Sequence, residues 1–501
     1  MSNSNMYLEI ARAVANGPDR IAIETEDGAS FTYGELHREV ARMANALLEV
    51  GLQPGDRVAA QLHKSVASLF VYLACLRAGL VYLPLNTAYQ SSELDYFLRD
   101  AEPGLILVEP DNADAVTALS KASVGAPVMT LAEDKDSGLA QRVAEASARF
   151  DTRLCAASDL AVIIYTSGTT GRSKGAMVTH GNLVSNARAL TQVWRFNNDD
   201  VLLHTLPIFH VHGLFVATHC ALTSGARMLW HDRFDAAAVV RQLKRASVFM
   251  GVPTYYTRLL GEPGLSPQSC RGMRLFISGS APLLAETHSK FEQRSGHRIL
   301  ERYGMSEAGM ITSNPYDGER RAGTVGFALP GVEVRVVDDT DQVLPVGEKG
   351  AIQIKGENVF SGYWRMLEKT KQEFTADGWF RTGDIGVFDR DGYLSIVGRA
   401  KDLIITGGYN VYPKEIELAL DELQQVVESA VIGVRHADYG EAVTGIVVLR
   451  EGAEADEANI IATLKSKLAG YKVPKRVHFV EGLPRNAMGK VQKNLLRERF
   501  G

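Results

Sequence analysis

The sequence of 501 residues contains few cysteines, and they are widely separated. Cys75, Cys155, Cys220 and Cys270 form no CxxC pair, which excludes a zinc ribbon and gives no disulfide framework. We interpret them as small buried apolar side chains in a reducing cytosol. None of them is assigned as a nucleophile.

The chain also lacks an excess of basic charge and a long apolar run. Its 54 Lys and Arg residues against 59 Asp and Glu residues give a formal net charge of −5. This balance provides no chain-wide basic surface for nucleic acid or anionic lipid. The most apolar stretch, residues 68–85, is interrupted by Arg77 and Gly79 and is too short to span a bilayer. The N-terminus does not resemble a signal peptide. We therefore expect a cytoplasmic protein without nucleic-acid or membrane partners.

The composition is typical of a globular protein, with 46% hydrophobic and 23% charged residues. The chain is long enough for about two to four domains. The first 150 residues alternate helix and strand patterns, which predicts mostly parallel sheets packed with helices. Residues 111–153 are poorly patterned, which suggests surface excursions. After Gly323 short strands of period two predict a barrel-like β subdomain. We predict an α/β fold with a large domain over residues 1–400 and a small mobile α+β domain over 401–501.

A glycine-rich loop follows the apolar strand predicted for residues 160–164. Residues 165–175 read YTSGTTGRSKG, in which glycines allow close approach of backbone N–H groups to an anion while hydroxyls and a lysine add donors and charge. The loop fails the Walker A pattern, because Ser173 stands where the second glycine belongs and Gly175 follows the lysine where Ser or Thr is required. It predicts nucleotide chemistry but not that of a P-loop kinase.

This loop resembles the signature loop of the acyl- and aryl-CoA synthetases of the adenylate-forming superfamily. Further motifs of that family follow in order along nearly the whole chain: VYLPLN, LPIFHVHGL, SGSAP, ERYGMSE, DGWFRTGD, GRAKD, GGYNVYP and PRNAMGK. The resemblance implies two half-reactions. A carboxylate attacks the α-phosphate of ATP to give an acyl-adenylate and pyrophosphate, and the thiol of coenzyme A then displaces AMP. The carboxylate is already ionised at neutral pH, so the first step needs charge neutralisation and alignment rather than a general base.

The resemblance also implies roles for individual residues. Tyr303 would stack against adenine, while Asp384 and Arg399 would hold the ribose. Glu307 would bind Mg²⁺ together with Thr169, as a hard cation with few protein ligands and several phosphate oxygens. The full set of implied ATP contacts is Thr166, Ser167, Gly168, Thr169, Thr170, Gly171, Lys174, Ser280, Ala281, Pro282, Glu301, Tyr303, Asp384, Arg399 and Lys490.

Lys490 in PRNAMGK resembles the lysine that bridges the carboxylate and the α-phosphate during adenylation. Lys401 matches the family's hinge, about which the small domain would rotate after adenylation to remove Lys490. Gly407 and Gly408 would then border the tunnel for the pantetheine of coenzyme A. Acetylation of Lys490 by a protein acetyltransferase would remove its charge. With Glu307, Thr169 and His210, Lys490 completes the implied catalytic set.

The acyl pocket is predicted from two motifs. His210 in LPIFHVHGL occupies the place of an aromatic gate between the carboxylate and thiol tunnels, and His212 is a weaker candidate. Arg302 in ERYGMSE stands where aryl and fatty-acyl ligases often carry a small or neutral residue, and it would pair with a second carboxylate. The motif ERYGM, which includes Met305, together with LPIFHVHGL and GSAPLLAETH most resembles malonyl-CoA synthetases, which also take methylmalonate. Arg258 could be a second cationic partner for the substrate.

Other interpretations stay open at this point. Arg302 could instead form an internal salt bridge with Glu301 or Glu307, and Arg258 could be a surface residue. The enzyme could be an AMP-forming CoA ligase for another short-chain or aromatic acid, separable by a substrate panel. An adenylation domain serving a carrier protein is a second class, and a kinase that releases ADP is a third.

Overall fold

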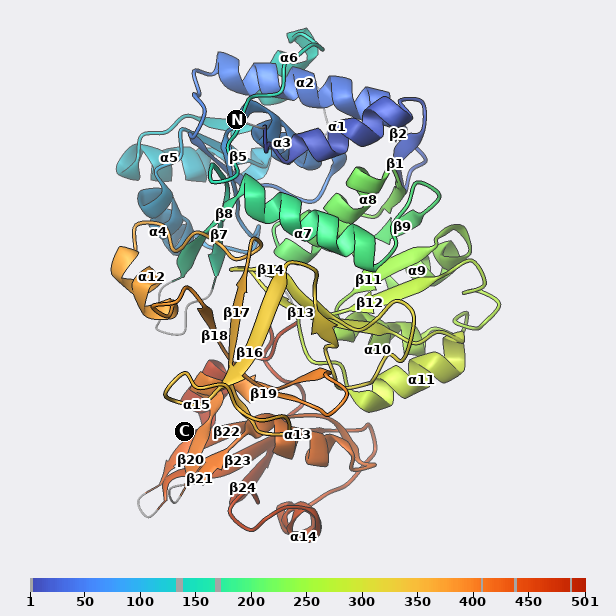
Figure 1. The fold of residues 1–501 in the computed structure, drawn as a ribbon, viewed down its shortest axis with the longest axis vertical. Helices are drawn as coiled ribbons and strands as arrows, with labels where there is room; N and C mark the ends of the chain where they lie inside the picture. The colour runs from blue at the N-terminus through green and yellow to red at the C-terminus, as the bar shows by residue number, and fades with distance from the viewer. Residues whose placement is uncertain (1–2, 132–137, 167–172, 407–408, 437–438, 487–488) are drawn as a thin grey trace.

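The computed structural model describes residues 3–131, 138–166, 173–406, 409–436, 439–486 and 489–501. Within these ranges the strands form four sheets, and the sheet nearest the C-terminus lies with its helices at one end of the molecule (Figure 1). No helix in the described ranges has the length and apolar character needed to cross a membrane. The predicted α/β architecture is confirmed.

The first sheet has the strand order β6-β5-β3-β4-β7-β8 and is parallel except for the pair β7-β8. Its central helix α3 (Val66–Ala78) is buried all round, begins at a capping box formed by Ser65 and Ser68, and ends at Gly79 in the left-handed region. The strands are β3 (Arg57–Gln61), β4 (Val81–Pro84), β5 (Leu105–Val108), β6 (Val128–Thr130), β7 (Leu160–Thr166) and β8 (Lys174–Thr179).

The expectation of surface excursions for residues 111–153 is wrong in part. This segment contains a helix, α5 (Ala113–Ser123), the edge strand β6 and a second helix, α6 (Gly138–Glu145). The strand has only three residues, all of them half-buried, so neither length nor alternation marks it in the sequence.

The second sheet has the order β15-β14-β13-β12-β11-β9-β10-β1-β2, with a parallel centre and antiparallel pairs at both edges. The carboxyl ends of its parallel strands form the edge where ligands bind in such sheets. The strands are β1 (Ile21–Thr25), β2 (Ser30–Thr32), β9 (Val201–His204), β10 (Arg227–Trp230), β11 (Val248–Gly251), β12 (Leu275–Ser278), β13 (Leu300–Met305), β14 (Gly309–Ser313) and β15 (Phe327–Ala328).

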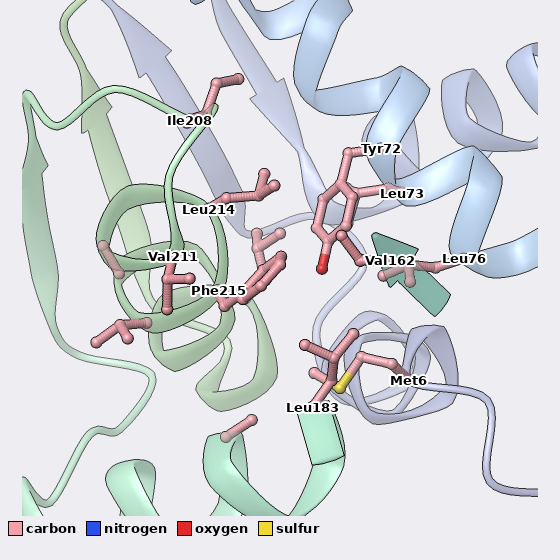
Figure 2. Close-up of a cluster of buried hydrophobic side chains, with 14 of the residues drawn as sticks. Met6, Tyr72, Leu73, Leu76, Val162, Leu183, Ile208, Val211, Leu214 and Phe215 are labelled. Carbon is pink, nitrogen blue, oxygen red and sulfur yellow. The ribbon is translucent and has the colours of Figure 1, made fainter. Parts of the chain in front are cut away.

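A shared core joins these two sheets. Figure 2 shows Tyr72 of α3 packed towards Leu214 and Phe215, which lie on a short π-helix, η2 (His212–Ala217). The remaining helical segments of this region are α1 (Tyr7–Asn16), α2 (Tyr33–Glu49), α4 (Ser91–Ala101), η1 (Pro110–Asn112), α7 (His180–Val193), α8 (Thr218–Ser224), α9 (Ala236–Gln242), η3 (Leu243–Arg245), α10 (Pro253–Gly261) and α11 (Ala285–Ser295).

The predicted β subdomain is an antiparallel sheet with the order β16-β17-β18-β19. A turn of 3-10 helix, η4 (Ala400–Asp402), leads from it to the C-terminal sheet. The elements are β16 (Val332–Val337), β17 (Gly350–Gly356), α12 (Leu367–Glu373), β18 (Phe380–Phe388) and β19 (Leu394–Arg399).

The C-terminal part has its own core, built around Ile416, Val431 and Ile460. Its sheet has the order β21-β20-β23-β22, with β24 added beside β23. The domain boundary at Lys401 stays a prediction. The elements are β20 (Ile404–Thr406), β21 (Tyr409–Val411), α13 (Pro413–Asp421), β22 (Val426–His436), β23 (Gly440–Leu449), α14 (Glu457–Lys467), β24 (Arg476–Phe479) and α15 (Lys493–Phe500).

Candidate active site

Several of the predicted site residues lie at the carboxyl end of β13, on β18 and β19 and in the loop before α15. Some predictions lie outside the described residues: those for Ser167, Gly168, Thr169, Thr170 and Gly171 in the phosphate loop, and those for Gly407 and Gly408 in the C-terminal part.

The predicted ribose contacts form a hydrogen-bonded group. Asp384 and Arg399 are paired opposite each other in the β18-β19 ladder, and Arg399 Nε lies 2.9 Å from Asp384 Oδ1. The hydroxyl of Tyr303 donates to Asp384 Oδ2 at 2.5 Å. Burial and the neighbouring carboxylate raise the pKa of Tyr303, so it stays a donor. Both oxygens of Asp384 therefore have protein partners before a ribose binds.

The residues predicted to bind the phosphates and Mg²⁺ are connected through Tyr363, a residue that the sequence analysis did not identify. Tyr363 donates its hydroxyl to Glu307 Oε1 at 3.1 Å, and Thr166 Oγ1 donates to the same oxygen at 3.4 Å. Lys174 Nζ lies 4.3 Å from the centre of the Tyr363 ring and 3.6 Å from Glu373 Oε1. One carboxylate with adjacent hydroxyl groups is a hard oxygen donor set, which fits Mg²⁺ completed by phosphate oxygens and water.

The residues predicted to border adenine lie on the loop after β12 and on β13. Ser280 is a non-glycine residue at φ 72°, while Ala281 is half-buried and Pro282 is exposed. The Glu301 carboxyl accepts a hydrogen bond from Gly323 N at 3.1 Å, and burial raises its pKa to about 8. Glu301 is therefore a neutral acid at pH 7.

The acyl side contains a buried guanidinium, two of whose nitrogens have no hydrogen-bond partner among the described residues. Arg302 is 3% exposed, and neither Nε nor Nη2 has a hydrogen-bond partner in the described part of the chain. Its guanidinium lies over Gly279, where a Cβ atom would stand 2.4 Å from Arg302 Cζ. Burial lowers its pKa to about 9, which still leaves it charged at pH 7. Neither Glu301 nor Glu307 forms the internal salt bridge that would make Arg302 purely structural.

Two neutral histidines stand beside this cation. Burial, reinforced by the positive charges of Lys490 and Arg302, lowers the pKa of His210 to about 3. His212 is 1% exposed; its Nδ1 lies 3.3 Å from Ser280 Oγ, and its Nε2 has no partner among the described residues. Burial and the charge of Arg302 lower the pKa of His212 as well. The pocket thus combines a cation with neutral imidazoles.

The two further acyl-pocket predictions have different outcomes. Met305 is half-buried and packs against the main core. Arg258 is exposed on α10, on the same face as Thr254 one turn earlier. Its role as a second cationic partner stays a prediction.

Lys490 reaches the site from the C-terminal part. A Cβ atom added to Gly489 would lie 3.4 Å from Thr254 Oγ1, so the loop containing Lys490 packs against α10. Enclosure in the cleft and the charge of Arg399 lower the pKa of Lys490 to about 8, while Asp384 and Glu307 act in the opposite direction. Its side chain keeps access to solvent. Lys490 therefore stands among the groups predicted to bind ATP.

Comparison with known proteins assigns a class to this site. The family model for an AMP-binding enzyme matches residues 10–364, and that for the AMP-binding enzyme C-terminal domain matches residues 415–490. The chain belongs to the family of AMP-binding enzymes. The resemblance to the adenylate-forming superfamily is confirmed.

Within this family, the chain is 54% identical to MatB from Rhodopseudomonas palustris. The alignment with its ATP-bound crystal structure covers 100% of this chain and 99% of that chain, with a TM-score of 0.97. A malonate–CoA ligase from Arabidopsis thaliana is 35% identical over 99% of this chain and 90% of its own length. A feruloyl-CoA synthase from Amycolatopsis sp is 36% identical over the full length of both chains.

The overall arrangement of the chain resembles one structure of that relative more than another. The TM-score is 0.97 against ATP-bound MatB and 0.86 against apo MatB, at the same 54% identity and the same coverage. The overall arrangement is therefore closer to that of the nucleotide-bound relative, in agreement with the position of Lys490.

Proposed function

We propose that this protein joins a short dicarboxylate, malonate or methylmalonate, to coenzyme A through an acyl-adenylate, with release of AMP and pyrophosphate. The observation that carries the choice of acid is the buried guanidinium of Arg302, whose Nε and Nη2 atoms have no hydrogen-bond partner within the described ranges. The likeness to MatB and to a malonate–CoA ligase supports it.

A second carboxylate is the group that this pocket lacks. A buried charge without a partner is costly, and a carboxylate can accept parallel hydrogen bonds from two guanidinium nitrogens. An apolar acyl tail in the same place would leave Arg302 unpaired. The unpartnered Nε2 of His212 adds a polar contact on the same side. The pocket should therefore discriminate strongly against monocarboxylates.

The adenylation step would then depend on charged side chains held beside the reacting groups. The reacting carboxylate attacks the α-phosphorus while pyrophosphate leaves, and the ammonium of Lys490 neutralises charge that develops between them. Asp384 and Tyr303 would exchange their mutual hydrogen bond for contacts with the nucleoside. Glu307, with Thr169 by resemblance, would hold Mg²⁺, which neutralises phosphate charge when bound.

Thioester formation would require a second arrangement. Rotation about Lys401 would withdraw Lys490 and present Gly407 and Gly408 to pantetheine, after which the sulfur of coenzyme A attacks the acyl carbon and AMP leaves. His210, which is neutral at pH 7 because of its lowered pKa, would separate the two tunnels. The solvent access of Lys490 also leaves it open to a protein acetyltransferase, which would stop adenylation by removing the charge.

The test is pyrophosphate release with coenzyme A across malonate, methylmalonate, butyrate and benzoate. We expect kcat/KM for the two dicarboxylates to exceed that for butyrate by about 10²-fold or more, because a monocarboxylate leaves the guanidinium unpaired. A preference for butyrate would refute the dicarboxylate assignment. A preference for benzoate or ferulate would favour the second candidate, an aromatic-acid CoA ligase, for which the likeness to a feruloyl-CoA synthase is the supporting observation.

A further inference from the structure

A partly buried lysine, Lys64, lies behind the acyl pocket and belongs to none of the family motifs described above. Lys64 follows β3 and precedes α3, yet its side chain reaches the carboxyl ends of β9 and β10 in the other sheet. Its Nζ lies 2.9 Å from His204 Nδ1, donates to His204 O at 2.8 Å and also donates to His231 O. The Trp230 ring centre lies 4.3 Å away. Its hydrogen bonds thus go to an imidazole and backbone carbonyls.

The geometry around His204 fixes the protonation states. His204 Nε2 lies 3.0 Å from Gly213 O, which can only accept, so Nε2 must carry a hydrogen. Burial and the charge of Lys64 lower the pKa of His204, so its ring is neutral and Nδ1 is the acceptor. Lys64 Nζ donates to His204 O and His231 O and faces the Nδ1 acceptor of His204, while burial lowers the pKa of Lys64 well below the ordinary lysine value.

Gly213 is the second residue of the π-helix that begins at His212. Its carbonyl also accepts from Thr218, through the backbone N–H and through Oγ1 at 2.9 Å. A Cβ atom on Gly213 would lie 2.1 Å from Pro207 O, so this turn is confined from the opposite side too. A π-turn inserts an extra residue into a helix and often marks a functional site. Here it orients His212 towards the pocket of Arg302.

We propose that Lys64 and His204 are positioning residues for acyl-substrate selection. Lys64 fixes the tautomer and orientation of His204, which holds the carbonyl of Gly213 and so sets the position of His212. Leu214 and Phe215 anchor the other side of the same turn in the apolar core (Figure 2). The inference rests on the proposed function, because the property it controls is the preference for a dicarboxylate.

The first test compares malonate with butyrate in matched variants. Lys64→Met removes the hydrogen-bonding amino group at similar length, and we expect about a tenfold rise in KM for malonate, little change in kcat and a fall of about fivefold or more in the malonate-to-butyrate ratio of kcat/KM. The KM for ATP should change less than about twofold. His204→Gln, whose amide can donate to Gly213 O, should retain more of this ratio than His204→Leu. Lys121→Met, at an exposed position of α5, is the control.

An unchanged ratio in Lys64→Met and His204→Leu, with only a lower melting temperature, would show a purely structural role and overturn the inference. A wild type that releases no pyrophosphate with malonate would instead refute the proposed function. If Lys64→Met and His204→Leu do not fold, ¹⁵N NMR of the wild-type histidines, assigned with the more conservative His204→Gln, decides. We expect the neutral Nε2–H tautomer of His204 between pH 6 and 9, and the Nδ1–H tautomer would contradict the proposal.

Discussion

The two sides of the site differ in how their polar groups are paired before a ligand binds. On the nucleotide side, Asp384 is bonded to Tyr303 and Arg399, and Glu307 is bonded to Tyr363. On the acyl side, Arg302 keeps two unpaired nitrogens in the described structure. ATP binding therefore exchanges existing hydrogen bonds, which changes the free energy little per bond, whereas a dicarboxylate supplies the first partner to a buried charge. Discrimination should accordingly be sharper on the acyl side.

The largest effect is expected at Lys490, where the two sides meet. Lys490→Ala should reduce adenylation by on the order of 10³-fold, because only that transition state uses its charge. Thioester formation from supplied malonyl-adenylate should persist. Pyrophosphate exchange measures the first step and thiol consumption the second. An equal loss in both steps would contradict the two-conformation account.

A proline at the hinge should slow thioester formation more than adenylation, which is the reverse of the effect of Lys490→Ala. Lys401→Pro fixes φ near about −65° and removes a backbone N–H, so rotation of the C-terminal part should slow. We expect thioester formation to fall by about tenfold or more while pyrophosphate exchange persists. Single-turnover measurement of both steps separates them. Unchanged turnover would place the hinge elsewhere.

The pH dependence of adenylation should report Lys490. Its pKa of about 8 in the free enzyme means that the active charged form dominates below pH 8 and is lost as pH rises through that value. The kcat/KM for ATP in pyrophosphate exchange should fall about tenfold from pH 7 to pH 9. The residual rate of Lys490→Arg should show no such fall, because guanidinium stays charged. A flat wild-type profile across this interval would be inconsistent with the position of Lys490.

The smallest effect is expected on the nucleotide side. Tyr303→Phe removes the hydroxyl that occupies Asp384 Oδ2, but a ribose hydroxyl can take its place. The KM for ATP should therefore change by less than about threefold. A loss of 10²-fold would show that the hydroxyl binds the nucleotide directly and would remove the contrast between the two sides.

The sequence predicted much of this arrangement through its motifs. The alternation of helix and strand patterns expected in the first 150 residues includes the helix α3 (Val66–Ala78), whose apolar residues and capping serines carry a strong local signal. The motifs also assigned Tyr303 to adenine and Asp384 and Arg399 to the ribose. In the structure these three residues are linked to one another by a hydrogen bond and an ion pair. This arrangement depends on the β18-β19 register and was not predicted.

Contacts between distant segments explain what sequence reasoning missed. Tyr363 stands 56 positions from Glu307, and Lys64 stands 140 positions from His204, so no local period links them. The turn at Gly213 passes close to Pro207 O, where an added Cβ atom would lie 2.1 Å away, and no local sequence pattern indicates this contact. Arg258 was predicted from residue type alone, which does not fix the direction of a side chain.

The account depends most directly on Arg302. The decisive measurement is the ratio of malonate to butyrate kcat/KM in the wild type and in Arg302→Leu. We predict that the variant loses about 10²-fold or more of its malonate kcat/KM, gains relative activity on butyrate and keeps its KM for ATP, so the ratio collapses. If the ratio does not change, Arg302 does not bind the second carboxylate, and the dicarboxylate assignment loses its structural support.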